Sequence, residues 1–372
     1  MYIRPTRRRS RRWLWIVAAL LLLALAFVLL RWPGLDSIRL PGRERPTPTP
    51  TQIGVKERIS IADRLLDEGQ VSQAIAEYRH ITELDPSNST AHARLGRLLT
   101  LRGRGEEGLR AARRAVELDS ENAQNQAIYG MVLDWGGEYD AAVEACLKAI
   151  DLDPMDATSY AYLAEAYADK GRLEQALQTA DKAVSLDGSN FYAYRNRGYV
   201  LERRGDYDGA IADYAEAIAL QPHLSYLYLS LGRVYRARGD YEGAIGEFLK
   251  AIEADADDPT SYDSLGLAYY AQQELELAVA QFKKATEVDP EYANGYGHLG
   301  WGYYVQRRYE DAIPQFEKAI SLGATAIEFY YELGLSYAYI DDCAKARPWL
   351  QKALEIDPQA EPALQGLKIC GG

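Results

Sequence analysis

The chain has 372 residues, contains 42 Lys and Arg against 54 Asp and Glu, and carries a formal net charge of −12. Residues 1–58 hold 12 basic and 3 acidic residues, so the remainder holds 30 basic and 51 acidic residues, a net charge of −21. A surface this acidic repels nucleic acid, and we expect no nucleic-acid partner. Three cysteines in a chain of this length exclude a disulfide-rich scaffold.

The first predicted element is a membrane anchor at residues 13–32. Six arginines lie in residues 1–12, and residues 13–30 form an unbroken apolar run. At about 1.5 Å per helical residue, this run crosses most of a hydrocarbon core of roughly 30 Å. A cleaved signal peptide is the alternative, but its apolar region is usually shorter, and Ala24 and Ala26 lie inside the run. The arginines favour a cytoplasmic N-terminal arm of a single-pass protein in the cell membrane, with the rest of the chain outside the cytoplasm.

Residues 33–54 predict an extended stalk. Pro41, Pro46, Pro48 and Pro50 lie in this segment, most of them alternating with threonine. Such a composition forms no packed core and favours the polyproline II conformation. At about 3.1 Å per residue, the stalk would hold the following domain well away from the bilayer.

From residue 55 the sequence repeats with a period of 34 residues. A first row of small residues recurs at this interval: Ala62, Gly96, Gly130, Ala164, Gly198, Gly232, Gly266, Gly300 and Gly334. A second row follows twelve residues after the first: Ala74, Gly108, Ala142, Ala176, Ala210, Ala244, Ala278, Ala312 and Ala346. A fixed period of this length indicates a solenoid. Small side chains in two rows would let two helices cross closely.

Each repeat predicts two helices. Around the first row, Tyr228, Leu231 and Tyr235 have the spacing of one helical face. Around the second row, Ala244 and Phe248 are also spaced along one face. In several repeats a proline follows the second helix, which ends it because proline lacks the N–H that a continuing helix needs. The predicted fold is therefore all-α.

These residues resemble the tetratricopeptide repeat (TPR) family, and the resemblance covers residues 55–360 as nine units without an insertion. It implies a right-handed α-solenoid of about nine helical hairpins. Residues 361–372 are expected to form a half-repeat that caps the last hydrophobic face. The first three units place Arg58, His92 and Gln126 where later units have tyrosine. We expect these units to pack more loosely or to act as an N-terminal cap.

No pattern in the sequence predicts catalysis, a cofactor or a metal site. The four histidines lie in different repeats, without partners at metal-ligand spacing. The glycines of residues 295–302 resemble a phosphate loop, but the apolar pattern continues the helix of that repeat. We expect that the protein is not an enzyme.

The TPR resemblance places a partner site on the concave face, which the first helix of each repeat lines. In the fifth and sixth repeats the predicted inward residues form a basic patch: Tyr192, Arg195, Tyr199, Arg203, Tyr226, Arg233 and Arg236. In the seventh to ninth repeats they form an aromatic and aliphatic wall: Leu267, Tyr270, Trp301, Tyr304, Val305, Tyr331, Leu335 and Tyr339. Gly297 on this face is predicted to make room for a ligand. The alternative is that the tyrosines crowd a tightly wound superhelix and the arginines pair with neighbouring glutamates.

Two functions follow from this organisation. A membrane-anchored scaffold would bind a protein or extended peptide in the groove, and this is the function we expect. The alternative is a structural protein that self-associates and braces a complex of the cell envelope.

Buried polar groups and cysteines give further predictions. Arg197 occupies a position that holds leucine in other repeats, so we expect Asp213 on the facing helix to pair with it. Cys146 replaces a core aromatic residue and is expected to be buried. Cys343 and Cys370 either form a disulfide between the last hairpin and the cap or remain free thiols, which is the favoured alternative.

Overall fold

The computed structural model describes residues 18–22 and 54–371. The chain divides into two units, Met1–Ile53 and Gly54–Gly372. In the first unit only the short helical segment 18–22 is described, so the fold below is that of the second unit.

The predictions for the N-terminal unit are untested. The basic arm at residues 1–12 lies outside the described residues, as do most of the anchor at residues 13–32 and of the stalk at residues 33–54. A search of the described helices finds none with the length and apolar character needed to cross a membrane.

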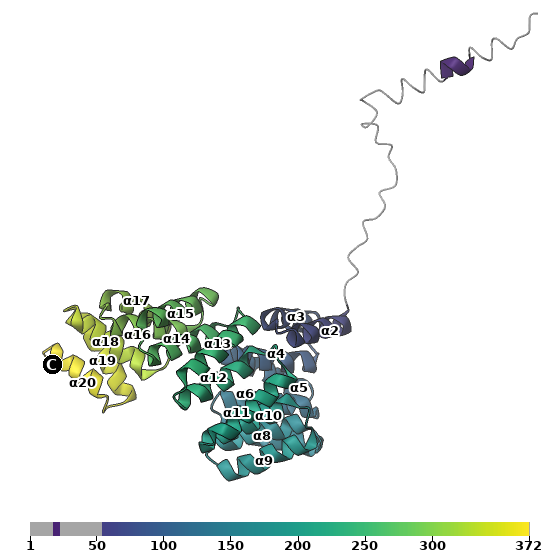
Figure 1. Cartoon of the computed structure of the whole chain (residues 1–372), viewed down its shortest axis with the longest axis horizontal. Coiled ribbons are helices and arrows are strands. Elements are labelled where there is room, and N and C mark those ends of the chain that lie inside the picture. Colours follow the sequence, from purple (N-terminus) through teal and green to yellow (C-terminus); the bar gives the residue numbers. More distant parts are fainter. Residues whose placement is uncertain (1–17, 23–53, 372) are drawn as a thin grey trace, which may run out of the picture. The chain divides into compact units, whose positions relative to one another are not determined.

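Residues 54–371 contain only helices, nineteen of them, and eighteen pair into nine consecutive hairpins (Figure 1). The first four repeats are α2 (Val55–Asp67) with α3 (Val71–Leu84), α4 (Ser89–Leu101) with α5 (Gly105–Leu118), α6 (Ala123–Trp135) with α7 (Tyr139–Leu152), and α8 (Ala157–Asp169) with α9 (Leu173–Leu186). The next three are α10 (Phe191–Arg204) with α11 (Tyr207–Leu220), α12 (Ser225–Ala237) with α13 (Tyr241–Ala254), and α14 (Pro259–Ala271) with α15 (Leu275–Val288). The last two are α16 (Ala293–Val305) with α17 (Tyr309–Ser321) and α18 (Ile327–Tyr339) with α19 (Cys343–Ile356), followed by the single helix α20 (Glu361–Ile369). The predicted all-α solenoid is confirmed.

The period of 34 residues also fixes where the first helix of many repeats begins. The side chains of Asn88, Asn122, Asp156, Asn190 and Asp258 each accept a hydrogen bond from a backbone N–H of the helix that follows. They satisfy donors that the first turn of a helix leaves without a partner. A polar residue at this position therefore stops the preceding turn and starts the helix.

The break between the two helices of a hairpin requires a residue with positive φ. Glycine fills this position in the first six repeats: Gly69, Gly103, Gly137, Gly171, Gly205 and Gly239. In the last three repeats Gln273, Arg307 and Asp341 take the same position, with φ of 65°, 60° and 61°. Residues with a Cβ are strained in this conformation by about 1–2 kcal/mol, whereas glycine is not.

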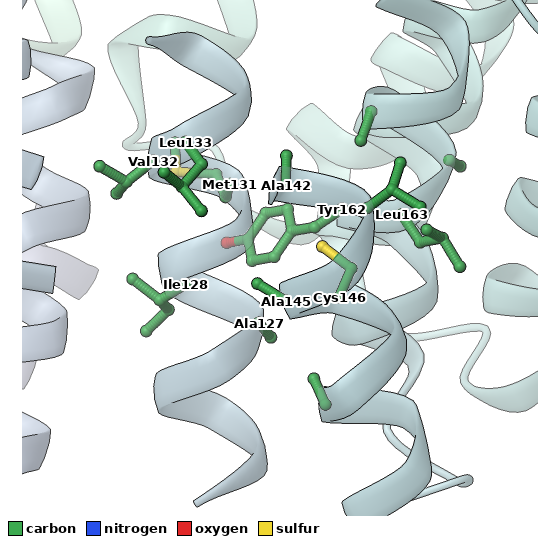
Figure 2. Close-up of a cluster of buried hydrophobic side chains, with 14 of the residues drawn as sticks. Ala127, Ile128, Met131, Val132, Leu133, Ala142, Ala145, Cys146, Tyr162 and Leu163 are labelled. Atoms are coloured by element: carbon green, nitrogen blue, oxygen red, sulfur yellow. The ribbon is translucent and has the colours of Figure 1, made fainter. Parts of the chain in front are cut away.

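The first row of small residues lets a large side chain of the second helix lie against the first helix. A Cβ added to Gly232 would stand 2.5 Å from the ring of Phe248, and a Cβ on Gly266 would be as close to Phe282. In the third repeat the Cys146 thiol takes the place of the ring and is fully buried, as predicted (Figure 2).

His92 and Gln126 make the contact that tyrosine makes in later repeats. The Tyr228 and Tyr330 hydroxyls each donate to the carbonyl oxygen of the residue six positions earlier. The Nε2 atoms of His92 and Gln126 lie 3.2 Å and 2.9 Å from the equivalent carbonyl oxygens. The expectation of looser packing is therefore wrong for the second and third repeats, because a different polar side chain closes the same turn.

The solenoid is wound more tightly in its first half. The first helices of the second to fifth repeats pack against one another, whereas those of the sixth to ninth repeats touch at few positions. Ala93, Ala127 and Ala161 occupy one position of the period in the tight part and are buried. Leu229 and Asp263 hold that position in the wider part. Small side chains there favour close approach of the first helices in the second to fourth repeats. Arg195 in the tight part and Gly297 in the wider part hold the same position, so this position alone does not set the winding.

This tight winding brings the first two repeats into contact with the sixth. Arg102, just after α4, forms ion pairs with Asp255 and Asp258, which lie just after α13. Gly69 has no room for a side chain, because an added Cβ would stand 2.3 Å from the carbonyl oxygen of His223. The first six repeats therefore form a closed turn, here called the first-turn ring, which the sequence analysis did not predict.

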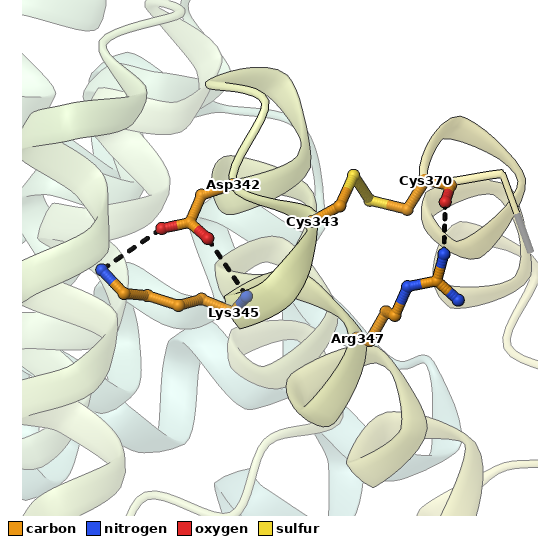
Figure 3. Close-up of a disulfide and its surroundings, with 5 residues drawn as sticks. All are labelled: Asp342, Cys343, Lys345, Arg347 and Cys370. Carbon is orange, nitrogen blue, oxygen red and sulfur yellow. Dashed lines mark hydrogen bonds and ion pairs between the residues drawn. A yellow bond between two sulfur atoms is a disulfide. The ribbon is translucent and has the colours of Figure 1, made fainter.

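The C-terminal cap is held to the last hairpin by a disulfide (Figure 3). Cys343 begins α19, Cys370 follows α20, and their Cα atoms are 5.4 Å apart. Arg347 donates a hydrogen bond to the carbonyl oxygen of Cys370. The favoured prediction of two free thiols is therefore wrong, and the disulfide left open as the other alternative is the one formed.

Candidate functional site

The first-turn ring encloses a cavity of about 390 Å³. Tyr192 and Tyr226, two of the predicted inward residues, line it together with Arg97 from the second repeat. Leu98 and Ile128 contribute apolar wall. The concave face of the first six repeats therefore contains a pocket that is partly open to solvent.

The predicted arginines of the fifth and sixth repeats are largely paired with acidic side chains. In each case the acid lies on the first helix of the preceding repeat: the pairs are Arg195 with Glu165, Arg203 with Asp169, and Arg233 with Glu202. All three guanidinium groups lie within 6 Å of the Tyr199 ring. Burial and the neighbouring Arg233 lower the pKa of Arg236. The pairing held as the alternative is thus confirmed, while contact of these residues with a partner stays a prediction.

The predicted pair of Arg197 and Asp213 is confirmed. Nε and one terminal nitrogen of Arg197 donate to the two carboxylate oxygens of Asp213 over 2.7 Å and 2.8 Å. Asp213 is buried and Arg197 is partly buried. The hydrogen bonds to Asp213 outweigh burial and raise the pKa of Arg197. The charged residue in an apolar row is therefore compensated inside its own hairpin.

Aromatic side chains gather along the first helices of the seventh to ninth repeats. The Tyr270 and Trp301 ring centroids are 3.9 Å apart, and Tyr309 lies 5.7 Å from Tyr304 and 4.8 Å from Tyr339. Tyr339 is 42% exposed. We call the predicted residues of this group the aromatic face: Tyr270, Trp301, Tyr304, Tyr331 and Tyr339. Leu267 and Val305 are partly buried beside them.

Two residues predicted at this face serve packing instead. Gly297 leaves room for the Phe329 ring of the next repeat, because an added Cβ would stand 2.2 Å from it. The prediction that Gly297 admits a ligand is therefore wrong. Leu335 is buried and contacts Gly366 of α20, so it belongs to the C-terminal core.

A buried polar cluster beside the aromatic face was not predicted. Nδ1 of His298 lies 2.8 Å from a carboxylate oxygen of Asp263, and the Tyr292 hydroxyl donates to the other oxygen. Burial alone would lower the pKa of His298, but the attraction of Asp263 outweighs it and the pKa is raised. The sequence did not predict this pair, because His298 and Asp263 are 35 residues apart and form no known motif.

Glu332 is a second buried group that the sequence did not reveal. Its side chain is buried, and one carboxylate oxygen has no hydrogen-bond partner in the described part of the chain. Burial and the nearby Glu328 raise the pKa of Glu332 to about 8. This carboxyl group is therefore mostly protonated at neutral pH.

The hairpins, their close crossings and their concave face define the class of α-solenoid repeat proteins. Two family models match the chain, one described as "Tetratricopeptide repeat" over residues 59–123, 163–225 and 298–361, the other as "TPR repeat" over residues 136–171, 232–273 and 266–306. The first alone matches more than half of the chain, and the chain belongs to the tetratricopeptide repeat family.

Solved structures share this fold at low sequence identity. A structure titled as the APC/C hetero-tetramer Cut9–Hcn1 has a TM-score of 0.57 and 20% identity, covering 80% of this chain and 58% of that chain. The chain thus spans less than two thirds of that relative. The Pseudomonas aeruginosa pilF structure has a TM-score of 0.49 and 18% identity, covering 56% of this chain and 96% of its own. A thermophilic TPR protein of Thermus thermophilus has a TM-score of 0.44 and 22% identity, covering 48% of this chain and 98% of its own. No curated protein matches the chain.

Proposed function

We propose that this protein is a non-catalytic scaffold that binds a protein or extended peptide on the aromatic face, and that residues 13–32 anchor it in a membrane. The observation that carries the proposal is the presence of two aromatic groups on first helices that touch one another at few positions: Tyr270 with Trp301, and Tyr304 with Tyr339. Tyrosine and tryptophan provide large rigid contact area and a polar edge, which suits a peptide laid across them.

The position of the repeats outside the cytoplasm belongs to the same proposal. The arginines before the apolar run support a cytoplasmic N-terminus. The disulfide between Cys343 and Cys370 supports an oxidising compartment for the repeats, because such bonds are rare in the reducing cytosol.

Cross-linking in membranes tests the scaffold. With a photo-reactive residue in place of Tyr304, we expect an adduct with a different protein, identified by mass spectrometry. Tyr331→Ser combined with Tyr339→Ser should reduce the adduct at least about fivefold, as expected when binding residues at an interface are truncated. Tyr139→Ser is the matched control, because Tyr139 is 40% exposed on a second helix and away from this face. Adducts only between copies of the chain would overturn the scaffold and favour the self-associating alternative.

Topology is tested separately with fusions after Gly372. A reporter that is active only outside the cytoplasm is expected to work at this site. Activity of a reporter that requires the cytoplasm, at the same site, would overturn the proposed orientation.

A further inference from the structure

The cavity of the first-turn ring contains a positive charge without a counter-ion. Arg97 lies on α4, on the inner wall of the ring, and is partly buried, with its Nε atom shielded from solvent. Its guanidinium carbon is 5.4 Å from the centre of the Tyr192 ring. Within residues 54–371 it forms no ion pair, and its Nε has no hydrogen-bond partner. An arginine held in this way retains its charge because its pKa lies far above neutrality.

Two hydroxyl groups beside Arg97 also lack partners. The Tyr162 and Tyr226 hydroxyls are both buried. The Tyr162 oxygen lies close enough to Arg97 to accept a weak hydrogen bond from it, but no described residue accepts the O–H hydrogen of either tyrosine. Both residues and Arg97 line one small recess next to the main cavity. Burial raises the pKa of Tyr162 and of Tyr226, so both hydroxyls remain protonated donors. Three donor groups therefore lie at one recess, and Glu165, which also lines it, accepts from Arg195 and Trp135 instead.

Of the carboxylates that line the cavity, Asp63 and Asp156 have other partners. Asp63 accepts hydrogen bonds from Arg94 and from Tyr78, and Asp156 caps α8. Asp67, also on the cavity wall, is exposed at the surface. None of these three forms an ion pair with Arg97.

Two further acids lie deeper in the ring. Glu165 is paired with Arg195 and accepts a hydrogen bond from Trp135. Burial and the neighbouring Glu165 raise the pKa of Asp134 to about 9, which leaves it protonated at neutral pH. Neither Glu165 nor Asp134 therefore forms an ion pair with Arg97.

We propose that the first-turn ring binds a small organic carboxylate, with the carboxylate on Arg97 and the Tyr162 and Tyr226 hydroxyls and an apolar body against the aliphatic wall. A buried charge without a partner carries a large desolvation cost, which an entering anion offsets. A guanidinium group presents donors in a fork that matches a carboxylate. The cavity has the size of a small-molecule site, and Leu98, Ile128 and Phe191 supply its apolar wall.

The site depends on closure of the ring. Arg97 belongs to the second repeat and Tyr226 to the sixth, and closure brings both onto one cavity. A ligand that contacts both residues favours the closed state, since it binds that state better than an open one. This site is separate from the aromatic face, so its test is independent of the proposed scaffold function.

Calorimetry and thermal unfolding of the full chain in detergent test the proposal. The probe is sodium benzoate, with benzylammonium chloride as the matched cation. Benzoate is expected to bind and to raise the unfolding temperature, while benzylammonium has no such effect. Arg97→Met should weaken benzoate binding at least about tenfold, which corresponds to the loss of one hydrogen-bonded charge. Tyr226→Phe keeps the ring and removes one donor, so it provides a milder test that preserves packing.

Arg238→Met is the control, because Arg238 is exposed and pairs with Asp208 on the outside of the ring. It should leave benzoate binding unchanged. N-acetylphenylalanine distinguishes the source of the carboxylate. Tighter binding than benzoate indicates the end of a peptide chain, and weaker binding indicates a free small acid. Either result supports the site. The proposal is overturned if N-acetylphenylalanine amide binds as well as the acid, if no carboxylate probe binds, or if Arg97→Met binds benzoate as the parent chain does.

Discussion

At the scale of single residues, this solenoid differs from a simple apolar stack in the number of charged groups that it buries. Arg195, Arg197 and Asp213 lie on helices whose equivalent positions are apolar or neutral in most other repeats. The hairpin of the fifth repeat tolerates them because each has a partner within hydrogen-bond distance. The Arg197 pair was predictable, since Arg197 interrupts a row of leucines and Asp213 precedes the packing Tyr214 on the facing helix of the same hairpin.

Removing one member of this pair should cost more than removing both. Arg197→Leu leaves the buried Asp213 without its partner, and we expect a loss of about 1–3 kcal/mol in the free energy of unfolding. Arg197→Leu with Asp213→Ala restores the residue types found in other repeats and should recover at least half of that loss. Denaturant unfolding of the single and double variants measures the coupling. Equal losses in the single and double variants would show that the pair contributes nothing specific.

Glu332 predicts a pH dependence of stability with a definite sign. Its folded pKa of about 8 lies above its ordinary value of 4.5, so the folded chain holds a proton that the unfolded chain releases. Its contribution to stability is complete below pH 4.5, falls as the pH rises, and is lost at about pH 8. Glu332→Gln removes this titration, and we expect it to be more stable than the parent chain at pH 8 by about 2–4 kcal/mol.

The measurement is denaturant unfolding of both proteins at several pH values between about 5 and 8. This range lies between the pKa of Glu332 in the unfolded chain and its pKa in the folded chain. The difference between them should grow with pH. Glu276→Gln serves as control, because Glu276 is exposed and the substitution replaces the same residue types. A constant difference across the window would contradict a raised pKa at Glu332.

At the scale of helices and turns, the two rows of small residues predict the hairpins. They do not predict which of the turns between the two helices are strained. Gly69 to Gly239 fill the left-handed break in six repeats, and Gln273, Arg307 and Asp341 fill it in the last three. The sequence shows that these three repeats lack glycine at the break. The strain can be inferred only from the structure, which shows that this position has positive φ.

Exchanging residues at this position should change stability in opposite directions. Arg307→Gly relieves strain in the eighth repeat, and we expect a gain of about 0.5–1 kcal/mol, since glycine also loses more backbone entropy on folding. Gly239→Arg places the same strain in the sixth repeat and should cost about 1–2 kcal/mol. Thermal unfolding of both variants checks the pair. A loss of stability in Arg307→Gly would mean that contacts of the arginine side chain outweigh the strain.

At the scale of the whole solenoid, the sequence predicts the repeat number and the all-α class, because each depends on contacts between neighbouring repeats. Ring closure depends on Arg102 and Asp255, which are separated by 153 residues. Asp255 belongs to a row of aspartates that follows the second helix of most repeats, so nothing in the period marks it as the partner of Arg102. The small residues Ala93, Ala127 and Ala161 carry part of this information as a local change in curvature. The sequence of one repeat does not show how a small change in curvature adds up over six repeats. The same limit kept Arg97 out of the predicted site.

The last prediction concerns what keeps the ring closed. Arg102 and its two acidic partners are each less than 10% exposed as side chains, so Arg102→Gln leaves two buried carboxylates without a counter-charge. We expect the ring to open, because exposure to water relieves a penalty of about 3–5 kcal/mol. Spin labels on cysteines at the exposed Gln70 and Ala256 report the distance between the first and sixth repeats. Arg238→Gln, which breaks a surface pair between neighbouring repeats, is the control. A distance distribution as narrow in Arg102→Gln as in the parent would mean that apolar packing of Leu66 with Leu224 closes the ring without the ion pair.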